Sequence, residues 1–321
     1  MDKKVKKKNP LKLKACVVAL SLWGLSSVLA LYSSPVMAAE TTSNAAQEQV
    51  AGALHKKGLD LDNLHRYEEA LAAFNDLITR FGNSQNTKIQ GAVAKALNNK
   101  GFDLAELHRY EEAIAAFNDL ITRFGNSQDK IIQEQVAMAL FNKGVDLESL
   151  HREEEALAAY NDVITRFGNS QDQNIQEQVE MALNNKGDDL YNLHRYEESL
   201  AANNDLITRF GNSQNTKIQE DVAIDLYNKG VLLYNLHRYE VALAANNDLI
   251  TRFGNSQNTK IQEQVARALN NKGVALAELH RIGQACAEWE ELVYRFKDNP
   301  DVKIQKSVKD ARHNLLVTRN F

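Results

Sequence analysis

The eleven residues NDLITRFGNSQ, Asn75 to Gln85, decide the fold of this chain because the chain repeats them. The same letters stand at 118–128, 204–214 and 247–257, and a copy with valine in third place stands at 161–171. Lysine-glycine pairs keep the same 43-residue interval, with their glycines at Gly58, Gly101, Gly144, Gly187, Gly230 and Gly273. A fixed interval of this length predicts a solenoid, in which each unit buries its apolar face on its neighbours.

Each unit is expected to fold as two helices. In the second unit, apolar residues recur at steps of three and four over 87–107, which predicts a first helix. A turn at His108-Arg109 follows. A second apolar stripe predicts a helix from Tyr110 to Phe124, and Gly125 is expected to end it, as glycine commonly does after a helix. The repeated eleven residues are therefore the end of the second helix and the loop behind it, and Asn-Ser-Gln is ordinary loop chemistry.

The pattern resembles the tetratricopeptide repeat. That family has a small residue, usually glycine, in the middle of its first helix, and here Gly101 takes that place. A small residue twelve positions later and an aromatic one four further on correspond to Ala113 and Phe117. Large apolar residues before and after the glycine correspond to Leu97 and Leu104.

The resemblance covers about 45–300 and departs from the family in three ways. The unit is longer than the family's usual length of about 34 residues. Lys100 stands where leucine is usual, and Gly125 stands near the place of a proline that often ends the unit. These departures concern the superhelical pitch rather than the stacking of helical hairpins.

We therefore predict an all-α fold, an α-α superhelix (solenoid) of six helical hairpins with a C-terminal capping helix. Ile304 and Val308 keep the phase of a seventh first helix, whose charged surface suits a solvating cap. The expected division is a signal peptide at 1–38, a leader at 39–44, units at about 45–86, 87–129, 130–172, 173–215, 216–258 and 259–300, and a cap and tail at 301–321.

The N-terminus has the composition of a secretory signal. Seven lysines precede an apolar run from Ala15 to Leu31, and small residues at Val36 and Ala38 suit signal peptidase. Cleavage is expected after Ala38, with Ala39 as second choice. An uncleaved membrane anchor is the alternative, because the apolar run is close to spanning length. The chain is then exported, to the periplasm of a two-membrane bacterium or otherwise out of the cell.

Charge and cysteine content limit the possible partners. The chain is 44% hydrophobic and 25% charged with 3 prolines, which is typical of a folded, helix-rich protein. Loss of residues 1–38 removes seven lysines and Asp2, and leaves 31 basic and 41 acidic residues, a net charge of −10. This argues against nucleic acid and against an anionic membrane surface as the main partner after signal cleavage. Cys286 is then the one cysteine left, so no intrachain disulfide is expected, and leucine or isoleucine at its place in the other units favours a core role.

The copies differ mainly along one stripe of the first helix. The differences lie six and three residues before the glycine and one, four and five residues after it. At about 100° per residue these places form a stripe roughly 100° wide, opposite the apolar face. In arrays that resemble tetratricopeptide repeats this face lines a concave groove that binds peptides. The candidate partner-binding residues are Phe141, Tyr191, Tyr227, Tyr234, Asn98, Phe102, Glu106, Glu148, Asn184, Asn192, Asn235 and Asn270.

Free drift of solvent-facing residues is the alternative explanation of the stripe. Two observations argue against it. The outer face of the second helix is as exposed by position yet barely varies, and the stripe contains several aromatic residues, which suit contact better than plain solvent.

Three further repeated features have simpler structural explanations than chemistry. The histidine of each Leu-His-Arg follows a first helix, where a polar group suits the exposed carbonyls. The lysine before each glycine lies on the apolar side and must extend to water or pair with a carboxylate, with Glu111, Glu112 and Asp119 as candidates for Lys100. Asn203 and Asn246 replace a core aromatic, which predicts either a weak spot or a polar pocket in units four and five.

No group of residues has the spacing of a catalytic, metal or cofactor site. We expect no enzyme, no metal and no cofactor. The expected function is an exported adaptor or scaffold that binds a protein or peptide segment in its groove. A structural spacer or self-associating envelope component is the alternative, and a hydrolase would need facing carboxylate pairs, which nothing in the sequence suggests for Glu106 and Glu148.

Overall fold

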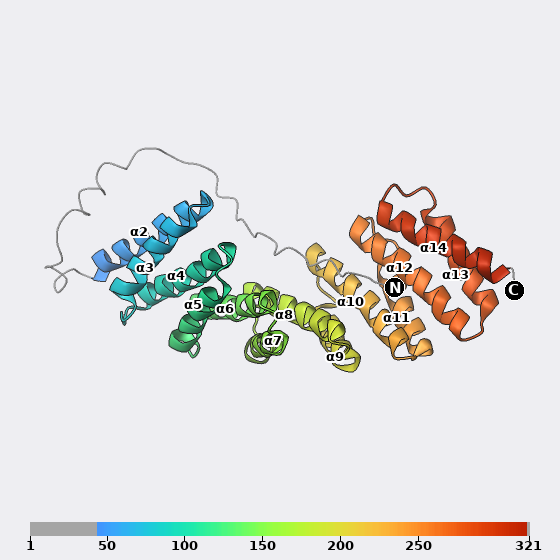
Figure 1. Cartoon of the computed structure of the whole chain (residues 1–321), viewed down its shortest axis with the longest axis horizontal. Coiled ribbons are helices and arrows are strands. Elements are labelled where there is room, and N and C mark those ends of the chain that lie inside the picture. The colour runs from blue at the N-terminus through green and yellow to red at the C-terminus, as the bar shows by residue number, and fades with distance from the viewer. Residues whose placement is uncertain (1–43, 320–321) are drawn as a thin grey trace. The chain divides into compact units, whose positions relative to one another are not determined.

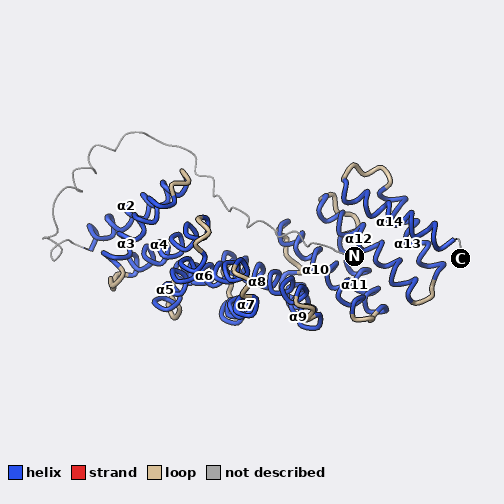
Figure 2. The backbone as a smooth tube through the Cα atoms, viewed as in Figure 1, coloured by secondary structure: helices blue, strands red, loops and turns tan. Residues whose placement is uncertain are grey.

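The computed structural model describes residues 44–319, and its helices follow one another in chain order with short loops between them (Figures 1 and 2). The predicted signal peptide lies outside the described residues. Thirteen helices and no strands occur in the described range, and they pack as one unit, Ala46–Phe321. The helices are α2 (Asn44–Asn63), α3 (Tyr67–Phe81), α4 (Thr87–Glu106), α5 (Tyr110–Phe124), α6 (Lys130–Ser149), α7 (Glu153–Phe167), α8 (Gln173–Asn192), α9 (Tyr196–Phe210), α10 (Thr216–Asn235), α11 (Tyr239–Phe253), α12 (Thr259–Glu278), α13 (Ile282–Phe296) and α14 (Val302–Arg319).

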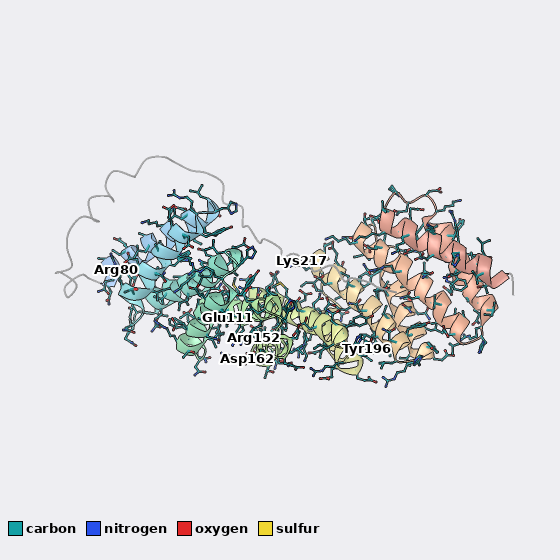
Figure 3. The ribbon with its side chains drawn as sticks, in the orientation of Figure 1. Arg80, Glu111, Arg152, Asp162, Tyr196 and Lys217 are labelled. Carbon is teal, nitrogen blue, oxygen red and sulfur yellow. The ribbon has the colours of Figure 1, made fainter. Side chains whose placement is uncertain are left out.

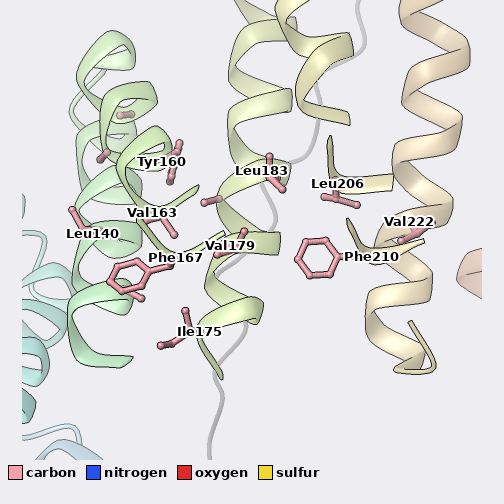
Figure 4. Close-up of a cluster of buried hydrophobic side chains, with 14 of the residues drawn as sticks. Leu140, Tyr160, Val163, Phe167, Ile175, Val179, Leu183, Leu206, Phe210 and Val222 are labelled. Carbon is pink, nitrogen blue, oxygen red and sulfur yellow. The ribbon is translucent and has the colours of Figure 1, made fainter. Parts of the chain in front are cut away.

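The predicted all-α solenoid of helical hairpins is confirmed. From α4 onward, each even-numbered helix is the first helix of a unit and packs on the odd-numbered helices before and after it, as far as these exist. Consecutive first helices from α4 to α14 also contact one another. Figure 4 shows side chains from adjacent units meeting in one core, such as Phe167 of α7 and Ile175 of α8. A unit therefore buries its apolar face mainly on its neighbours.

The glycine in the middle of each first helix permits a close approach of the second helix. A Cβ atom added at Gly101 would lie 2.4 Å from the ring of Phe117, which is fully buried. Gly58 and Phe74 have the same relation, and so do Gly144 and Tyr160. The small-residue and aromatic positions that carry the family resemblance are thus one packing contact.

The repeated eleven residues connect units. The arginine of the motif in unit four, Arg209, donates from Nη1 to the carbonyl of Gly168 in unit three, at 2.8 Å. Arg166 likewise donates to the carbonyl of Gly125, at 2.5 Å. These carbonyls end second helices and lack intrahelical donors, so a cation there is favourable. The motif is therefore inter-unit structure as well as loop chemistry.

The motif also starts the next helix. The hydroxyl of Ser84 accepts a hydrogen bond from the backbone nitrogen of Asn86, at 3.2 Å. The Asn86 side chain then caps α4 by accepting from the nitrogens of Lys88 and Ile89. The Gln90 amide returns to the carbonyl of Ser84, at 3.1 Å. Loop and helix start are thus fixed together.

Gly125 ends its helix, but not in the left-handed conformation that glycine commonly adopts there. Its φ is −57° and its ψ −23°, and no glycine among the described residues has a positive φ. A Cβ atom at this place would lie 2.4 Å from the carbonyl oxygen of Ile121. Lack of a side chain, rather than backbone freedom, is what the position requires.

The histidines of Leu-His-Arg take the left-handed role instead. All six have φ between 56° and 60°: His65, His108, His151, His194, His237 and His280. The nitrogen of His108 donates to the Ala105 carbonyl and that of Arg109 to the Leu104 carbonyl, at 2.9 and 2.8 Å, which is a Schellman motif. The expected structural role is confirmed, with a backbone basis that the sequence did not indicate.

The C-terminal helix α14 caps the array as predicted. Ile304 and Val308 are buried, in the phase of a seventh first helix. Leu316 stands one 43-residue step after Gly273 and is 66% exposed. A leucine thus stands where each unit has its glycine, so the close contact between glycine and aromatic ring is not repeated in α14.

The core is interrupted at units four and five. Asn203 and Asn246 are buried and lie against Gly187 and Gly230, where an aromatic ring lies in the other units. The Asn246 amide donates to the Ala242 carbonyl at 2.9 Å, but its oxygen has no donor among the described residues. A small separate cluster forms here, consisting of Leu200, Leu232, Leu233, Ala242 and Ala245.

Of the three carboxylates proposed for Lys100, Glu112 is near enough for the lysine charge to help lower its pKa, after the hydrogen bond from Arg109, whereas the other two pair with arginines. Glu111 pairs with Arg152, and Asp119 with Arg123. In other units, Lys272 pairs with Glu288 at 2.7 Å and Lys186 donates to Asn161 at 2.7 Å. These lysines therefore reach partners that the sequence did not identify.

Candidate functional site

The varied stripe divides into a buried part and an open part. The residues three before the glycine are largely covered by the neighbouring units. Asn98 is 3% exposed and its amide donates to Gln135 at 3.3 Å, and Asn184 and Tyr227 are each 8% exposed. The guanidinium of Arg267 in the next unit lies 4.7 Å from the centre of the Tyr227 ring. These three side chains cannot meet a partner without rearrangement.

Two more of the predicted residues three places before the glycine are half-buried. The Phe141 ring lies 5.8 Å from that of Tyr160, and it packs against the core. Asn270 accepts a hydrogen bond from Asn314 of α14 at 3.3 Å. Variation three places before the glycine is therefore variation in packing, within a unit at Phe141 and between neighbouring helical units at Asn98, Tyr227 and Asn270.

The open part of the stripe lies one, four and five residues after the glycine, toward the hairpin turn. Its exposed or half-buried members among the predicted residues are Phe102, Glu106, Glu148, Tyr191, Asn192, Tyr234 and Asn235. We call this strip the hairpin-turn edge and include the aspartates two places after the glycine.

Units four to six carry linked tyrosines on the hairpin-turn edge. The Tyr191 hydroxyl accepts from the Asn235 amide at 3.4 Å, and the Tyr234 hydroxyl donates to Glu278 at 2.9 Å. Each tyrosine also lies near a tyrosine that starts the second helix, with 5.5 Å between the centres of the Tyr191 and Tyr196 rings. The structure thus brings together three of the predicted residues from units four and five.

Units one to four carry carboxylates on the same edge. Asp103 is fully buried, and burial, followed by the nearby Asp62 and Glu106, raises its pKa to about 8. Burial, followed by Glu148, raises the pKa of Asp189 to about 8. Burial alone raises the pKa of Asp146 to about 7. Three aspartates one unit apart are therefore held where the charged form is disfavoured.

Sequence reasoning missed these aspartates because their place varies too little among units one to four to stand out. The signal was present two residues after the glycine, where Asp60, Asp103, Asp146 and Asp189 give way to Leu232 and Ala275. The change coincides with the arrival of Tyr191 and Tyr234 in the preceding units.

The arginines of Leu-His-Arg were also missed. Each of five arginines pairs with a glutamate in the second helix of the preceding unit. Figure 3 labels one such pair, Arg152 and Glu111, whose atoms are 3.1 Å apart. The others are Arg109 with Glu68, Arg195 with Glu154, Arg238 with Glu197, and Arg281 with Glu240. These exposed pairs contribute little singly, yet they recur at every junction.

A shallow hollow of about 320 Å³ lies on the first helices of units one to three. Gly52, Gly91 and Ile131 line it, together with His55 and Lys95. Burial, and then the charge of Lys95, lowers the pKa of His55 to about 4, so this imidazole is neutral at pH 7. The hollow exists partly because Gly91 stands where the other five units have glutamate.

The described residues contain neither a group of side chains suited to a metal ion nor a membrane-spanning helix. Within 44–319, no three histidine, cysteine, aspartate or glutamate side chains are grouped so as to hold a metal ion. No helix in that range is long and apolar enough to cross a membrane. Cys286 is half-buried on α13.

Comparisons with known proteins bear on the family. A model of the tetratricopeptide repeat matches residues 55–127 and 98–171. A search of curated proteins finds no match. Among solved structures, PilF of Pseudomonas aeruginosa is similar with 15% identity and a TM-score of 0.46, over 81% of this chain and 97% of that one.

Two other solved structures are similar to the same extent. A tetratricopeptide repeat protein from Parabacteroides merdae has 14% identity and a TM-score of 0.42, over 82% of this chain and 99% of that one. BtubC from P. vanneervenii has 13% identity and a TM-score of 0.47, over 86% and 93%. At these values the similarity carries no information about a partner.

The glycine and aromatic contact occurs in units one, two, three and six, and the family model matches the first three of these. Repeats of this kind form extended surfaces that suit a scaffold for protein interaction. The chain is a tetratricopeptide-repeat-like protein.

Proposed function

We propose that this protein is an exported adaptor that binds a protein or peptide segment along its first helices. The observation that carries the proposal is the pair of half-exposed tyrosines, Tyr191 and Tyr234, on adjacent units. Hydrogen bonds to Asn235 and Glu278 restrict their side chains before any partner arrives. Aromatic side chains held in place on a surface are favoured anchors for a partner.

Phe102 supports the same proposal from unit two. It is 40% exposed, one residue after Gly101, on the face of the first helix away from its own second helix. The hollow beside Gly91 offers space for an apolar side chain on the neighbouring first helices. An extended segment would thus find apolar contacts on units one to three and tyrosines on units four and five.

Export rests on the sequence of residues 1–38, with its lysines, apolar run and small residues. We expect the chain recovered from cells to begin at Ala39. Mass spectrometry of the intact protein tests this directly. A chain that retains residues 1–38 in the membrane fraction would support the anchored alternative.

Affinity capture from the cell-envelope fraction tests the binding function. The full chain is compared with a Phe102→Ala, Tyr191→Ala, Tyr234→Ala variant. A Val241→Ala, Tyr294→Ala variant is the matched control, because both residues are exposed on second helices. All three proteins should have equal helicity by circular dichroism.

A partner that the parent and the control retain, and the first variant loses, supports the adaptor. The second candidate function is a structural spacer, which the recurrent ion pairs between units favour because they stiffen each junction. Equal capture by all three proteins, or capture of nothing, would favour the spacer.

A further inference from the structure

The hairpin-turn edge of units one to four holds a row of carboxyl groups, and two of them, on Asp103 and Asp146, are buried with at least one oxygen that has no hydrogen-bond donor among the described residues. We propose that the partner segment is basic, and that its lysine or arginine side chains bind this row of carboxylates. The row consists of Asp62, Asp103, Glu106, Asp146, Glu148 and Asp189. The inference rests on the proposed adaptor function and specifies the chemistry of the partner.

The first group lies between units one and two. Asp103 is fully buried, and neither of its carboxylate oxygens has a hydrogen-bond donor among the described residues. The charged groups that act on it are Asp62 and Glu106, both carboxylates. Tyr67 also lies near, with its hydroxyl 3.5 Å from Glu106. A buried carboxylate that lacks both donor and cation is costly, so the site favours a proton or an incoming cation.

The second group lies between units three and four. The charged groups that act on Asp189 are Glu148, Asp188 and Glu153, and again all are carboxylates. Glu148 accepts a hydrogen bond from the Tyr160 hydroxyl, and Asn185 donates to that hydroxyl at 3.1 Å. This network holds the Glu148 carboxylate in one place next to the aspartate.

Asp146 lies one 43-residue step from both Asp103 and Asp189, between the two groups. It is 4% exposed, and its Oδ2 has no donor in the described part of the chain. Burial alone raises its pKa. A carboxyl group whose charged form burial disfavours is therefore present in each of units two, three and four, and is not confined to one junction.

The accessible members of the row allow a cation to approach. Asp62, Glu106 and Glu148 are half-buried, so an ammonium or guanidinium group can contact them from solvent. Asp103 and Asp146 are buried, and each adds a negative charge only when a cation displaces its proton, at short range where a low dielectric makes charge interactions strong. A cation that binds here should also release the proton that burial favours on Asp103.

The chemistry points to an amine or guanidinium rather than a metal ion. No group of three carboxylate, histidine or cysteine side chains in residues 44–319 has the geometry to hold a metal. Separate carboxylates one unit apart instead suit separate charges on a flexible chain. Packed helices lie about 8–10 Å apart, and every third residue of a polyproline II segment advances about 9 Å on one face. Basic residues three apart would thus match the row.

The opposite composition of units four to six supports an extended occupant with two parts. Two places after the glycine, Leu232 and Ala275 stand where units one to four have aspartate. Four places after the glycine, Tyr191 and Tyr234 stand where units one to three have an acidic or small residue. A segment with lysines toward one end and apolar or aromatic residues toward the other would complement both halves.

Fluorescence anisotropy with a defined peptide tests the inference. The probe is a labelled peptide of four Lys-Pro-Ser triplets, with Glu-Pro-Ser triplets as the charge-reversed comparison. The full chain is compared with an Asp62→Asn, Glu106→Gln, Glu148→Gln variant. This variant removes like-charge repulsion and should fold at least as well as the parent.

The matched control is Glu111→Gln, Glu154→Gln, Glu197→Gln. It removes the same number of negative charges, from glutamates on second helices that pair with arginines of the next unit. These ion pairs are exposed and individually weak. We expect about tenfold weaker binding of the lysine peptide to the first variant, and less than about twofold change in the control, with affinity falling as salt rises. Equal weakening in both variants, or no binding of the lysine peptide to the parent, would overturn the inference.

The capture experiment separates this inference from the adaptor function. A captured partner that the tyrosine variant loses and the carboxylate variant retains would leave the adaptor function standing and refute the basic partner. A partner that both variants lose, and the outer control retains, supports both.

Discussion

Replacing Asn203 by phenylalanine should stabilise the array. In unit two the equivalent Phe117 is fully buried and its ring covers Gly101. Asn203 is equally enclosed, at 3% exposed, and places its amide oxygen against Gly187 instead. The site thus has the surroundings of an aromatic core position without the aromatic, and it lies beside a break in the main apolar cluster.

The magnitude follows from burial. Truncating a buried phenylalanine to alanine costs about 3–5 kcal/mol, and asparagine recovers part of that volume while burying an amide. Adjusting the neighbours to a larger ring costs about 1–3 kcal/mol. A net gain of about 2 kcal/mol remains, which corresponds to a rise in melting temperature of about 3 °C for a chain of this size, because the entropy of unfolding grows by about 2.1 cal/mol/K per residue.

Thermal melts followed by circular dichroism, together with urea midpoints, measure the effect. Asn246→Phe should act in the same direction, because the Asn246 oxygen is buried without a donor. Phe117→Asn is the reverse change in an intact unit and should destabilise by several kcal/mol. A lower melting temperature for Asn203→Phe would refute the reasoning and show that units four and five are shaped around a polar pocket.

Three further changes test other parts of the account. Because burial raises the folded-state pKa of Asp146 to about 7 from 3.8, its protonated form favours folding. That contribution is full below about pH 4 and is lost as pH rises through about 7. Asp146→Asn should therefore increase the free energy of unfolding at pH 8, by at most about 4 kcal/mol, and raise the urea midpoint accordingly. At pH 4 both quantities should be nearly unchanged. His280→Gly should relieve left-handed strain and stabilise by up to about 1 kcal/mol. His108→Gly should gain less because it also loses a 2.9 Å contact with a tyrosine hydroxyl, and a larger gain at His108 in a thermal melt would contradict this. Gly101→Ala should destabilise by several kcal/mol through its clash with an aromatic ring, and an unchanged melt would show that the ring moves aside freely.

The fold was predictable from the sequence because local and repeated signals agree. Apolar steps of three and four residues placed the helix from Tyr110 to Phe124 as the structure has it, and the first helix of that unit ends one residue before its expected bound. The details of helix ends were less predictable. Gly125 has a right-handed conformation and His108 a left-handed one, because contacts with Ile121 and the Schellman hydrogen bonds decide these angles.

The candidate site was predictable only in outline. A helical projection places residues around one helix but does not say what the next unit covers. Asn98 and Tyr227 lie on the predicted stripe, yet neighbouring units bury them. Asp103 was missed for the opposite reason, since an aspartate three residues before the end of a helix looks like solvent surface until α2 and the residues around Asp62 close over it.

Residues of the hairpin-turn edge differ between units in pairs, and the two members of each pair belong to neighbouring units. An acidic residue at Asp62 in unit one acts on Asp103 in unit two, whereas Tyr191 in unit four packs on the cluster that contains Leu232 of unit five. The side chain four places after the glycine of one unit therefore determines which side chain fits two places after the glycine of the next unit. The surface offered to a partner is a property of junctions, not of single units. Changing Tyr191 to glutamate alone would leave a carboxylate against leucine, so moving the acidic part of the edge toward the C-terminus requires Leu232→Asp as well.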